Sequence, residues 1–289
     1  MQLQELDAAR RSVTTRSGEI SYIDIGTGPA ALFVHGVATN AYLWRNVIAP
    51  LASQRRCIAL DLPLHGRSPV ADGQDLSLSG LATVVEDFCD ALGLTGVDLV
   101  ANDTGGAIAQ IFAARHPERL ATFTLTNCDT EGNLPPEAFK PVVDMAAAGE
   151  LAPAMAAMME DIAAARDAAF GSAYERPADT DPEIIRAYLE PCVGTPERAR
   201  EFERLLVALD PGDLKAVEPQ LRELQVPTLV VWGTDDPFMD VSWAYWLRDT
   251  IPGVTKVVTV DGGKLFFPEE RPGDLIAPLT EHWAAHLRS

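Results

Sequence analysis

The sequence predicts an α/β fold in which helices flank a mostly parallel central sheet. Short apolar runs, typical of strands buried on both faces, alternate with amphipathic helical patterns through residues 18–127. The alternation stops at Asp129, and residues 131–224 are rich in helix formers without a convincing strand. It resumes at residue 226, so the C-terminal part of the chain is expected to complete the sheet.

Strands and helices are expected in a regular order along the chain. The expected strands are residues 18–25, 30–34, 56–61, 97–101, 122–127, 226–233 and 254–260. The first of them alternates apolar and polar residues, as an edge strand does. The expected helices of the sheet-bearing part are residues 42–51, 76–92, 105–115 and 274–287. Ser77 or Ser79 is the expected N-cap of the second helix.

These patterns divide the chain into two parts. Residues 1–130 and 225–289 are expected to form the α/β core, and residues 131–224 are expected to form a helical cap inserted between two strands. Residues 146–169 consist almost entirely of helix formers. The methionines of this stretch are more typical of an apolar interior than of a cofactor site, and no cofactor is expected.

The composition argues against several classes of partner. The 289 residues are 47% hydrophobic, which is enough for one large core with a subdomain. The chain has 42 acidic and 23 basic residues, and a net charge of -19 disfavours nucleic acid and anionic membranes. No signal peptide or membrane-length apolar run is recognised. The four scattered cysteines show neither metal nor disulfide spacing, so we expect a reduced, cytoplasmic protein without a metal. A monomer or a homodimer is expected.

The strongest local signal is a strand, a sharp turn and a helix at residues 97–106. A turn of this kind presents a nucleophile and needs small residues two positions on either side of it. Ala101 and Gly105 meet that need around Asp103. Thr104 is the poorer candidate because a β-branched side chain resists a positive φ. Asp103 is therefore the predicted nucleophile, and the alternative is a structural aspartate that caps the following helix.

Four segments together resemble the α/β-hydrolase superfamily, and within it the haloalkane dehalogenase and epoxide hydrolase branch. They are the His-Gly segment at 35–46, the Asp-Leu-Pro-Leu-His-Gly turn at 61–68, the Gly-Thr-Asp-Asp loop at 232–237 and the Glu-Glu-Arg-Pro segment at 269–272. Leu64 in the second segment replaces a glycine of the family pattern. The resemblance specifies the fold more closely than it specifies the reaction.

The resemblance implies a particular set of site residues. In that branch an aspartate forms an alkyl-enzyme ester, and a histidine held by a carboxylate activates the water that splits it. The backbone N–H groups of Val37 and Thr104 would form the oxyanion hole, and Asp129 or Asp236 would be the supporting acid. The residues expected at the substrate pocket are His35, Trp44, Leu265 and Phe266.

The chain departs from the family pattern at the catalytic histidine. Counting back from Pro272, the position falls on Leu265, or on Lys264 if the segment is shifted by one residue. The chain has no histidine between His116 and His282, so no alternative alignment restores it. The predicted site is therefore free of histidine.

The chain also departs from the family pattern at the two positions whose side chains bind the halide. Val37 stands at the position of an asparagine and Thr104 at that of a tryptophan, so haloalkane dehalogenation is not expected. Asp103, Asp129 and Asp236 are expected to converge at the carboxyl ends of their strands, which would raise at least one pKa. A metal held by these three is the weaker alternative because no ligand spacing supports it.

Several roles remain open for the surrounding residues. Lys264 either neutralises the carboxylates, acts as a base once desolvated, or is a solvated loop side chain. The leading hypothesis is an enzyme centred on Asp103 that opens an epoxide or catalyses a lyase or isomerase step on a small apolar molecule. The alternative is a ligand-binding pseudo-hydrolase. In a third hypothesis the cap supplies a base or an epoxide-polarising hydroxyl; its candidates are Glu160, Asp161, Tyr174 and Tyr188.

Overall fold

The computed structural model describes residues 3–286, apart from the side chains of residues 156 and 157, and it has a single sheet as its centre. Eight strands lie in the order β1-β2-β4-β3-β5-β6-β7-β8. The β1–β2 and β2–β4 pairs are antiparallel, and all other neighbouring pairs are parallel. The predicted α/β fold with a mostly parallel sheet is confirmed.

One of the eight strands was not predicted. The strands are β1 (Arg10–Thr15), β2 (Gly18–Ile25), β3 (Ala30–Val34), β4 (Arg56–Leu60), β5 (Val97–Asp103), β6 (Leu120–Cys128), β7 (Thr228–Gly233) and β8 (Val254–Val260). β1 has no fully buried residue, so its sequence carries no apolar run to reveal it. It pairs with residues 18–23 of β2, which therefore lies inside the sheet between β1 and β4, and the prediction of an edge strand at residues 18–25 is wrong.

The helices of the core are α1 (Leu3–Ala8), α2 (Arg45–Leu51), α3 (Leu78–Leu92), α4 (Thr104–Arg115), α10 (Pro211–Leu221), α11 (Ser242–Thr250), α12 (Phe267–Glu270) and α13 (Pro272–Ala285). Four core helices, α2, α3, α4 and α13, were predicted, whereas α1, α11 and α12 were not. Ser77 caps α3 by accepting a hydrogen bond from the N–H of Gly80. The predicted end of the last helix at Leu287 lies outside the described residues.

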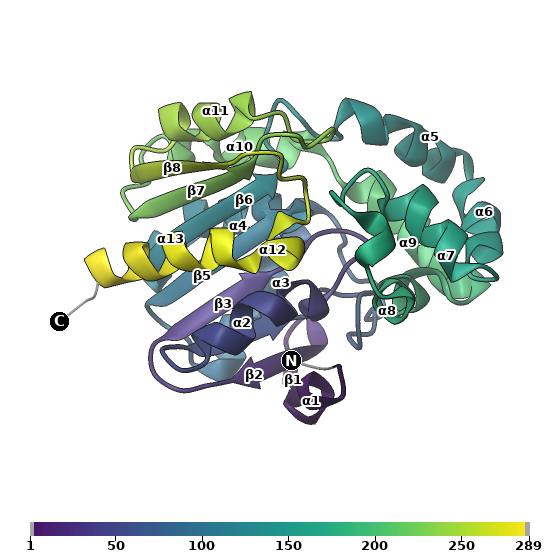
Figure 1. Ribbon diagram of the computed structural model, residues 1–289, viewed down its shortest axis with the longest axis horizontal. Helices are drawn as coiled ribbons and strands as arrows, with labels where there is room; N and C mark the ends of the chain where they lie inside the picture. Colours follow the sequence, from purple (N-terminus) through teal and green to yellow (C-terminus); the bar gives the residue numbers. More distant parts are fainter. Residues whose placement is uncertain (1–2, 287–289) are drawn as a thin grey trace.

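Helices cover both faces of the sheet. Figure 1 shows α2 and α13 in front of the strands, whereas α3 and α4 lie behind them. α11 packs against β7 and β8, and α10 packs against α3 and α4. Within residues 3–286, no helix has the combination of length and apolar character needed to cross a bilayer.

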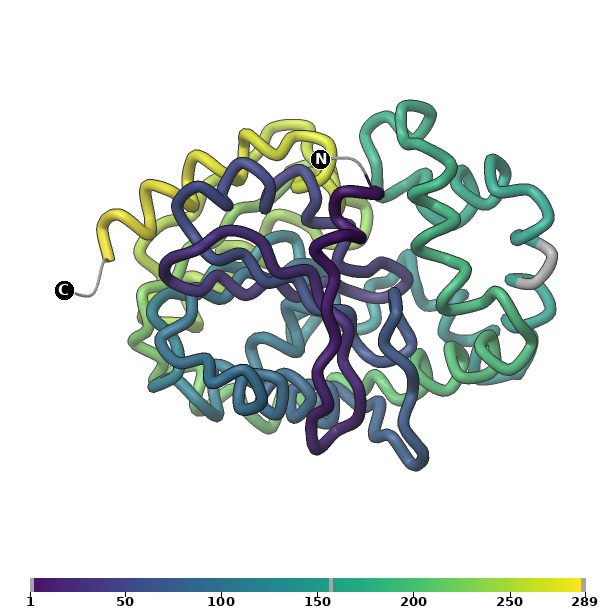
Figure 2. The backbone as a smooth tube through the Cα atoms, turned by 90° about the horizontal axis from the view of Figure 1, so that it is seen from below, coloured from purple at the N-terminus to yellow at the C-terminus, as the bar shows by residue number. Residues whose placement is uncertain are grey.

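The chain segment that connects β6 to β7 forms a helical region to one side of the sheet (Figures 1 and 2). It contains α5 (Lys140–Ala148), α6 (Leu151–Met158), α7 (Ile162–Ala165), α8 (Pro182–Val193) and α9 (Pro196–Ala208). Although α10 falls within the range expected for the cap, it packs on core helices. The helix-forming run at residues 146–169 is broken, because Gly149 ends α5 in the left-handed conformation.

Candidate active site

The strand–turn–helix at Asp103 has the backbone geometry of a strained elbow. Asp103 ends β5 with φ 57° and ψ -140°, and α4 begins at the next residue. A Cβ on Gly105 would collide with the backbone carbonyl of His35, and one on Gly106 would collide with Cys128. Both glycines therefore allow the elbow to pack tightly against the neighbouring strand ends.

Backbone N–H groups hold the carboxyl group of Asp103. The N–H groups of Val37 and Thr104 both donate hydrogen bonds to it, and the side chain is only 6% exposed. Burial and the nearby charge of Asp129 raise the pKa of Asp103 well above its ordinary value, despite these two donors. Gly36 allows the close approach, because a Cβ there would overlap the Asp103 carboxyl group.

Asp129 lies beside Asp103 at the end of the neighbouring strand. It is 1% exposed, and its Oδ2 accepts a hydrogen bond of 2.8 Å from the hydroxyl of Thr104. Its other carboxyl oxygen, Oδ1, is buried without a hydrogen-bond partner among the described residues. Burial raises the pKa of Asp129 to about 7, with the charge of Asp236 adding to the effect. The two carboxyls therefore form a coupled pair.

Asp236 is also buried, but both of its carboxyl oxygens accept hydrogen bonds from groups other than the Asp103–Asp129 pair. Its Oδ2 accepts a hydrogen bond of 2.8 Å from Asn127, and its Oδ1 accepts one of 2.9 Å from the N–H of Phe238. Burial raises the pKa of Asp236 to about 6, while these donors and the charge of Lys264 oppose the rise. Neither Asp236 nor the half-buried Lys264 lines the cavity described next.

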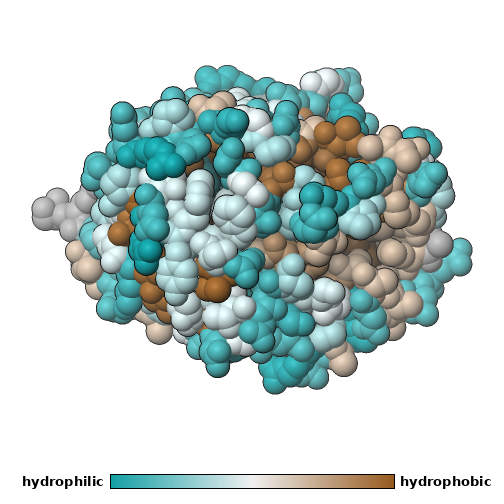
Figure 3. Space-filling view, turned by 90° about the horizontal axis from the view of Figure 1, so that it is seen from above, coloured by the Kyte–Doolittle hydropathy of each residue, from teal (hydrophilic) through white to brown (hydrophobic). Residues whose placement is uncertain are grey.

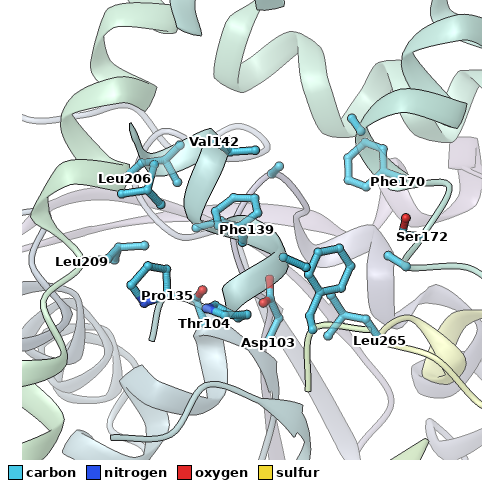
Figure 4. Close-up of a pocket in the computed structure, with 18 of the residues that line it drawn as sticks. Asp103, Thr104, Pro135, Phe139, Val142, Phe170, Ser172, Leu206, Leu209 and Leu265 are labelled. Atoms are coloured by element: carbon cyan, nitrogen blue, oxygen red, sulfur yellow. The ribbon is translucent and has the colours of Figure 1, made fainter. Parts of the chain in front are cut away.

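A cavity of about 360 Å³ opens above the Asp103–Asp129 pair. Figure 4 shows the Asp103 carboxyl group pointing into it, with Phe139 and Leu265 close by. Among the described lining residues, the polar side chains are Asp103, Thr104, Asp129 and Ser172, and the rest are apolar. Figure 3 shows apolar atoms gathered around a hollow on the cap side of the surface. A second cavity of about 560 Å³ shares no lining residue with the first.

The residues expected at the substrate pocket divide into two pairs. Leu265 and Phe266 line the cavity, as does Val37. His35 and Trp44 do not, because both are fully buried behind it. The His35 ring contacts the carbonyl of Gly36 and the N–H of Leu62, and Trp44 packs on Phe33.

None of the five imidazoles is hydrogen-bonded to Asp103 in the described part of the chain. The Nε2 of His65 accepts from the N–H of Ala38, and His116 lies 3.2 Å from a carboxyl oxygen of Glu86. His282 contacts the carbonyl of Pro227, and His286 contacts that of His282. Leu265 occupies the cavity wall where the family resemblance places the catalytic histidine.

The tyrosines expected to act on a substrate are engaged elsewhere. The hydroxyls of Tyr174 and Tyr188 both donate to Oε2 of Glu269 at 2.9 Å, and Arg45 pairs with Oε1 of Glu269 at 2.7 Å. These four residues, named the tyrosine–glutamate cluster below, join the cap to α2 and α12. Neither tyrosine belongs to the described lining of the cavity.

The cap carboxylates proposed as a base also lie outside the cavity lining. Asp161 is exposed and caps α7 by accepting from the N–H groups of Ala163 and Ala164. Glu160 is exposed, and neither residue belongs to the lining. Within the described residues, no group of three histidine, cysteine or acidic side chains is arranged to hold a metal ion. The structure therefore gives no support to the alternative of a metal held by the three aspartates.

Two asparagines that the sequence analysis did not single out organise the strand ends. Asn127 accepts from the N–H of Gly233 through Oδ1 and donates to Asp236 through Nδ2. Asn102 donates to the carbonyl of Leu265 at 3.0 Å and thereby fixes that loop beside the elbow. The signal in the sequence is the occurrence of an amide residue at the end of each of two apolar strands.

Comparisons with known proteins agree with this architecture. A curated relative from Burkholderia vietnamiensis, a 2-hydroxy-6-oxononadienedioate/2-hydroxy-6-oxononatrienedioate hydrolase, is 31% identical over 77% of this chain and 77% of its own. A haloalkane dehalogenase from Mesorhizobium japonicum is 38% identical, but the match spans 38% of this chain and about a third (36%) of that protein. A solved epoxide hydrolase, CorEH, superposes with a TM-score of 0.77 at 20% identity, covering 96% of this chain and 98% of that one.

The family model gives the assignment that these similarities share. The model described as alpha/beta hydrolase fold matches residues 29–179, which is just over half of the chain. That range includes the elbow at Asp103, the N–H donors of Val37 and Thr104, and Asp129. The chain belongs to the α/β-hydrolase-fold family.

Proposed function

We propose that this protein is an enzyme that uses Asp103 as its catalytic carboxyl group, without an imidazole partner, on a small apolar substrate. The observation that carries the proposal is the buried pair of Asp103 and Asp129 at the polar end of an otherwise apolar cavity. The cavity lies within the range of about 300–1,000 Å³ that is typical of small-molecule sites. Opening of an epoxide by water is the reaction that fits this pair best.

The raised pKa values of the two carboxyls support acid–base chemistry on an epoxide. Burial and the charge of Asp129 raise the pKa of Asp103 well above its ordinary value, and burial raises the pKa of Asp129 to about 7, so we assign one carboxyl as the acid and the other as the base. The base removes a proton from water, and the water oxygen bonds to a ring carbon. The ring C–O bond breaks, and its oxygen takes the proton of the acid. A proton transfer between the two carboxyls then restores the starting state.

A nucleophilic version of the reaction starts from the same residue. The Asp103 carboxylate would attack a ring carbon while the ring C–O bond breaks and the ring oxygen takes the proton of Asp129, giving a hydroxyalkyl ester whose carbonyl oxygen is held by the N–H groups of Val37 and Thr104. The ionised Asp129 would then remove a proton from the water that attacks the ester carbonyl and give it to the departing diol oxygen. A proton transfer from Asp103 to Asp129 would restore the starting state. Dehalogenation fits less well, because the Val37 side chain has no donor and the Thr104 hydroxyl already donates to Asp129.

Turnover of a panel of apolar epoxides tests the proposal. We expect Asp103→Asn to form diol at least about a hundredfold more slowly than the wild type, as is usual when an acid–base group is removed. Asp235→Asn, which changes an exposed neighbour of Asp236, is the matched control and should leave the rate unchanged. Equal rates for Asp103→Asn and wild type would remove Asp103 from the reaction.

A single turnover in ¹⁸O-labelled water separates the two versions. Direct attack by water places the label in the diol, whereas the nucleophilic route places an unlabelled Asp103 oxygen there in the first turnover. Intact-protein mass spectrometry would show the ester as an added mass equal to that of the epoxide.

A ligand-binding protein without turnover is the second candidate function. The observation that favours it is Leu265, whose aliphatic side chain forms part of the cavity wall. Tight binding of apolar molecules with no diol formed, and with the affinity unchanged in Asp103→Asn, would support this candidate in place of the enzyme.

A further inference from the structure

The cavity has an imbalance of charge that the proposed reaction does not use. Two carboxyl groups line it, and no lysine, arginine or histidine does so among the described residues. Lys264 faces Asp236, which lies outside the lining. A conventional site of this kind carries a histidine that becomes positively charged beside its carboxylates, and Leu265 stands in that place here.

The environment of Asp129 is a second observation, and it points to a ligand with a hydrogen-bond donor. The side chain is 1% exposed, and Oδ1 has no hydrogen-bond partner in the described part of the chain. A buried carboxylate oxygen without a donor costs free energy, and a bound donor removes that cost. A positively charged donor gains the most, because the attraction between opposite charges at low dielectric adds to the hydrogen bond.

The cavity walls and the surface of the protein favour the same kind of ligand. Five phenylalanines line the cavity, and the faces of aromatic rings attract organic cations. The net charge of -19 attracts cations and repels anions over a longer range. A small compound with an aliphatic body and one ammonium group matches both the apolar walls and the acidic floor.

We propose that this cavity binds hydrophobic primary amines as ammonium ions, which occupy the place of the missing imidazolium beside Asp103 and Asp129. The inference rests on the same site as the proposed function, but it concerns binding and not turnover. A bound ammonium would keep both carboxyls ionised and leave no acid for the epoxide oxygen. Hydrophobic amines are therefore competitive inhibitors of epoxide opening.

Isothermal titration with three matched probes tests the inference: hexylamine, hexan-1-ol and hexanoate. At pH 8 we expect hexylamine to bind at least tenfold more tightly than hexan-1-ol, and hexanoate to show no binding. Asp129→Asn should abolish the preference for the amine while hexan-1-ol still binds, which shows that the cavity is intact. Asp235→Asn is the control for overall charge and should retain the preference.

Proton release provides an independent readout on the wild-type protein. At pH 6 hexylamine should displace a proton from the carboxyl pair, and titrations in two buffers with different ionisation enthalpies measure that release. Equal affinity for hexylamine and hexan-1-ol, or an amine preference that survives in Asp129→Asn, would overturn the inference.

The outcomes separate this inference from the proposed function. If hexylamine does not bind but epoxide opening depends on Asp103, the inference alone fails. If hexylamine binds with the expected preference and no epoxide is opened, the proposed enzyme fails while the ligand class stands.

Discussion

Two buried clusters of ionisable side chains lie near the cavity, and they differ in how their charges are balanced. In the tyrosine–glutamate cluster, Glu269 is paired with Arg45 and accepts hydrogen bonds from Tyr174 and Tyr188. At the cavity floor, Asp103 and Asp129 are close together without a cation among the described lining residues.

The difference separates a structural role from a chemical one. A buried ion pair with its hydrogen bonds satisfied holds two parts of the fold together. A pair of carboxyls with raised pKa values is typical of a chemical site, and one of its oxygens, Oδ1 of Asp129, is buried without a hydrogen-bond partner among the described residues. The fold is expected to gain stability from the first cluster and to lose stability because of the second.

Removal of Glu269 should have the largest effect on stability. Glu269→Met leaves the buried Arg45 without its partner, and breaking a buried pair in this way typically costs about 3–5 kcal/mol. Urea unfolding at pH 7 measures the loss. The double variant Arg45→Met/Glu269→Met should be more stable than Glu269→Met, because it no longer buries an unpaired charge. A Glu269→Met protein as stable as wild type would contradict the structural role.

Asp129→Asn should stabilise the protein at alkaline pH, whereas Glu269→Met should destabilise it. The pKa of Asp129 is about 7 in the folded protein, above its ordinary value of 3.8, so the unfolded chain releases this proton at lower pH. The folded state is therefore destabilised progressively as pH rises from about 4 to about 7, by up to roughly 4 kcal/mol for a shift of this size. Asp129→Asn should remove that penalty and be more stable than wild type at pH 8.

The comparison across pH makes this prediction specific. Urea unfolding of Asp129→Asn and wild type should give a stability difference that shrinks as pH falls toward 4, because both side chains are then neutral. Asp235→Asn, whose carboxyl is exposed, should show no comparable trend. A variant that is less stable than wild type at every pH would mean that the Asp129 charge is compensated in the fold.

The sequence predicted the sheet and the elbow because both leave a simple pattern. A buried parallel strand requires a continuous apolar run, and the elbow requires small residues such as Gly105, which lies against the His35 carbonyl. β1 leaves no such pattern, because its polar residues are satisfied by pairing with β2 at the edge of the sheet. Predicting β1 would have required knowing that it pairs with β2.

The contacts that decide the chemistry were less accessible to sequence reasoning. The Thr104–Asp129 hydrogen bond depends on an irregularity of register between β5 and β6, where Asp103 pairs with Cys128. The positions of Tyr174 and Tyr188 depend on how the cap rests on α12, which helical periodicity does not specify. The pattern of residues therefore gave the candidate carboxyls but not which of them share the cavity.

Tyr174→Phe should weaken the tyrosine–glutamate cluster by a smaller amount. It removes one of two hydroxyls that donate to Oε2 of Glu269, while Tyr188 and Arg45 remain. We expect a loss of about 1.5–3 kcal/mol in urea unfolding, which is typical for a hydrogen bond to a charged group. Epoxide turnover should be unchanged, since Tyr174 does not line the cavity. A lost turnover with unchanged stability would assign the hydroxyl to the reaction.

Thr104→Val should produce the smallest effect, a change in the pKa of Asp129 at the cavity floor. The valine keeps the backbone N–H that holds Asp103 but removes the hydroxyl that donates to Asp129. Since this donor stabilises the ionised form, its loss should raise the pKa of Asp129 further above about 7, by roughly 0.5–1 unit for a hydrogen bond of about 1 kcal/mol. The midpoint of the pH dependence of hexylamine affinity measures the shift. If Thr104→Val lowers that midpoint, the hydroxyl does not stabilise the Asp129 carboxylate, and the proton of the pair is held by other groups.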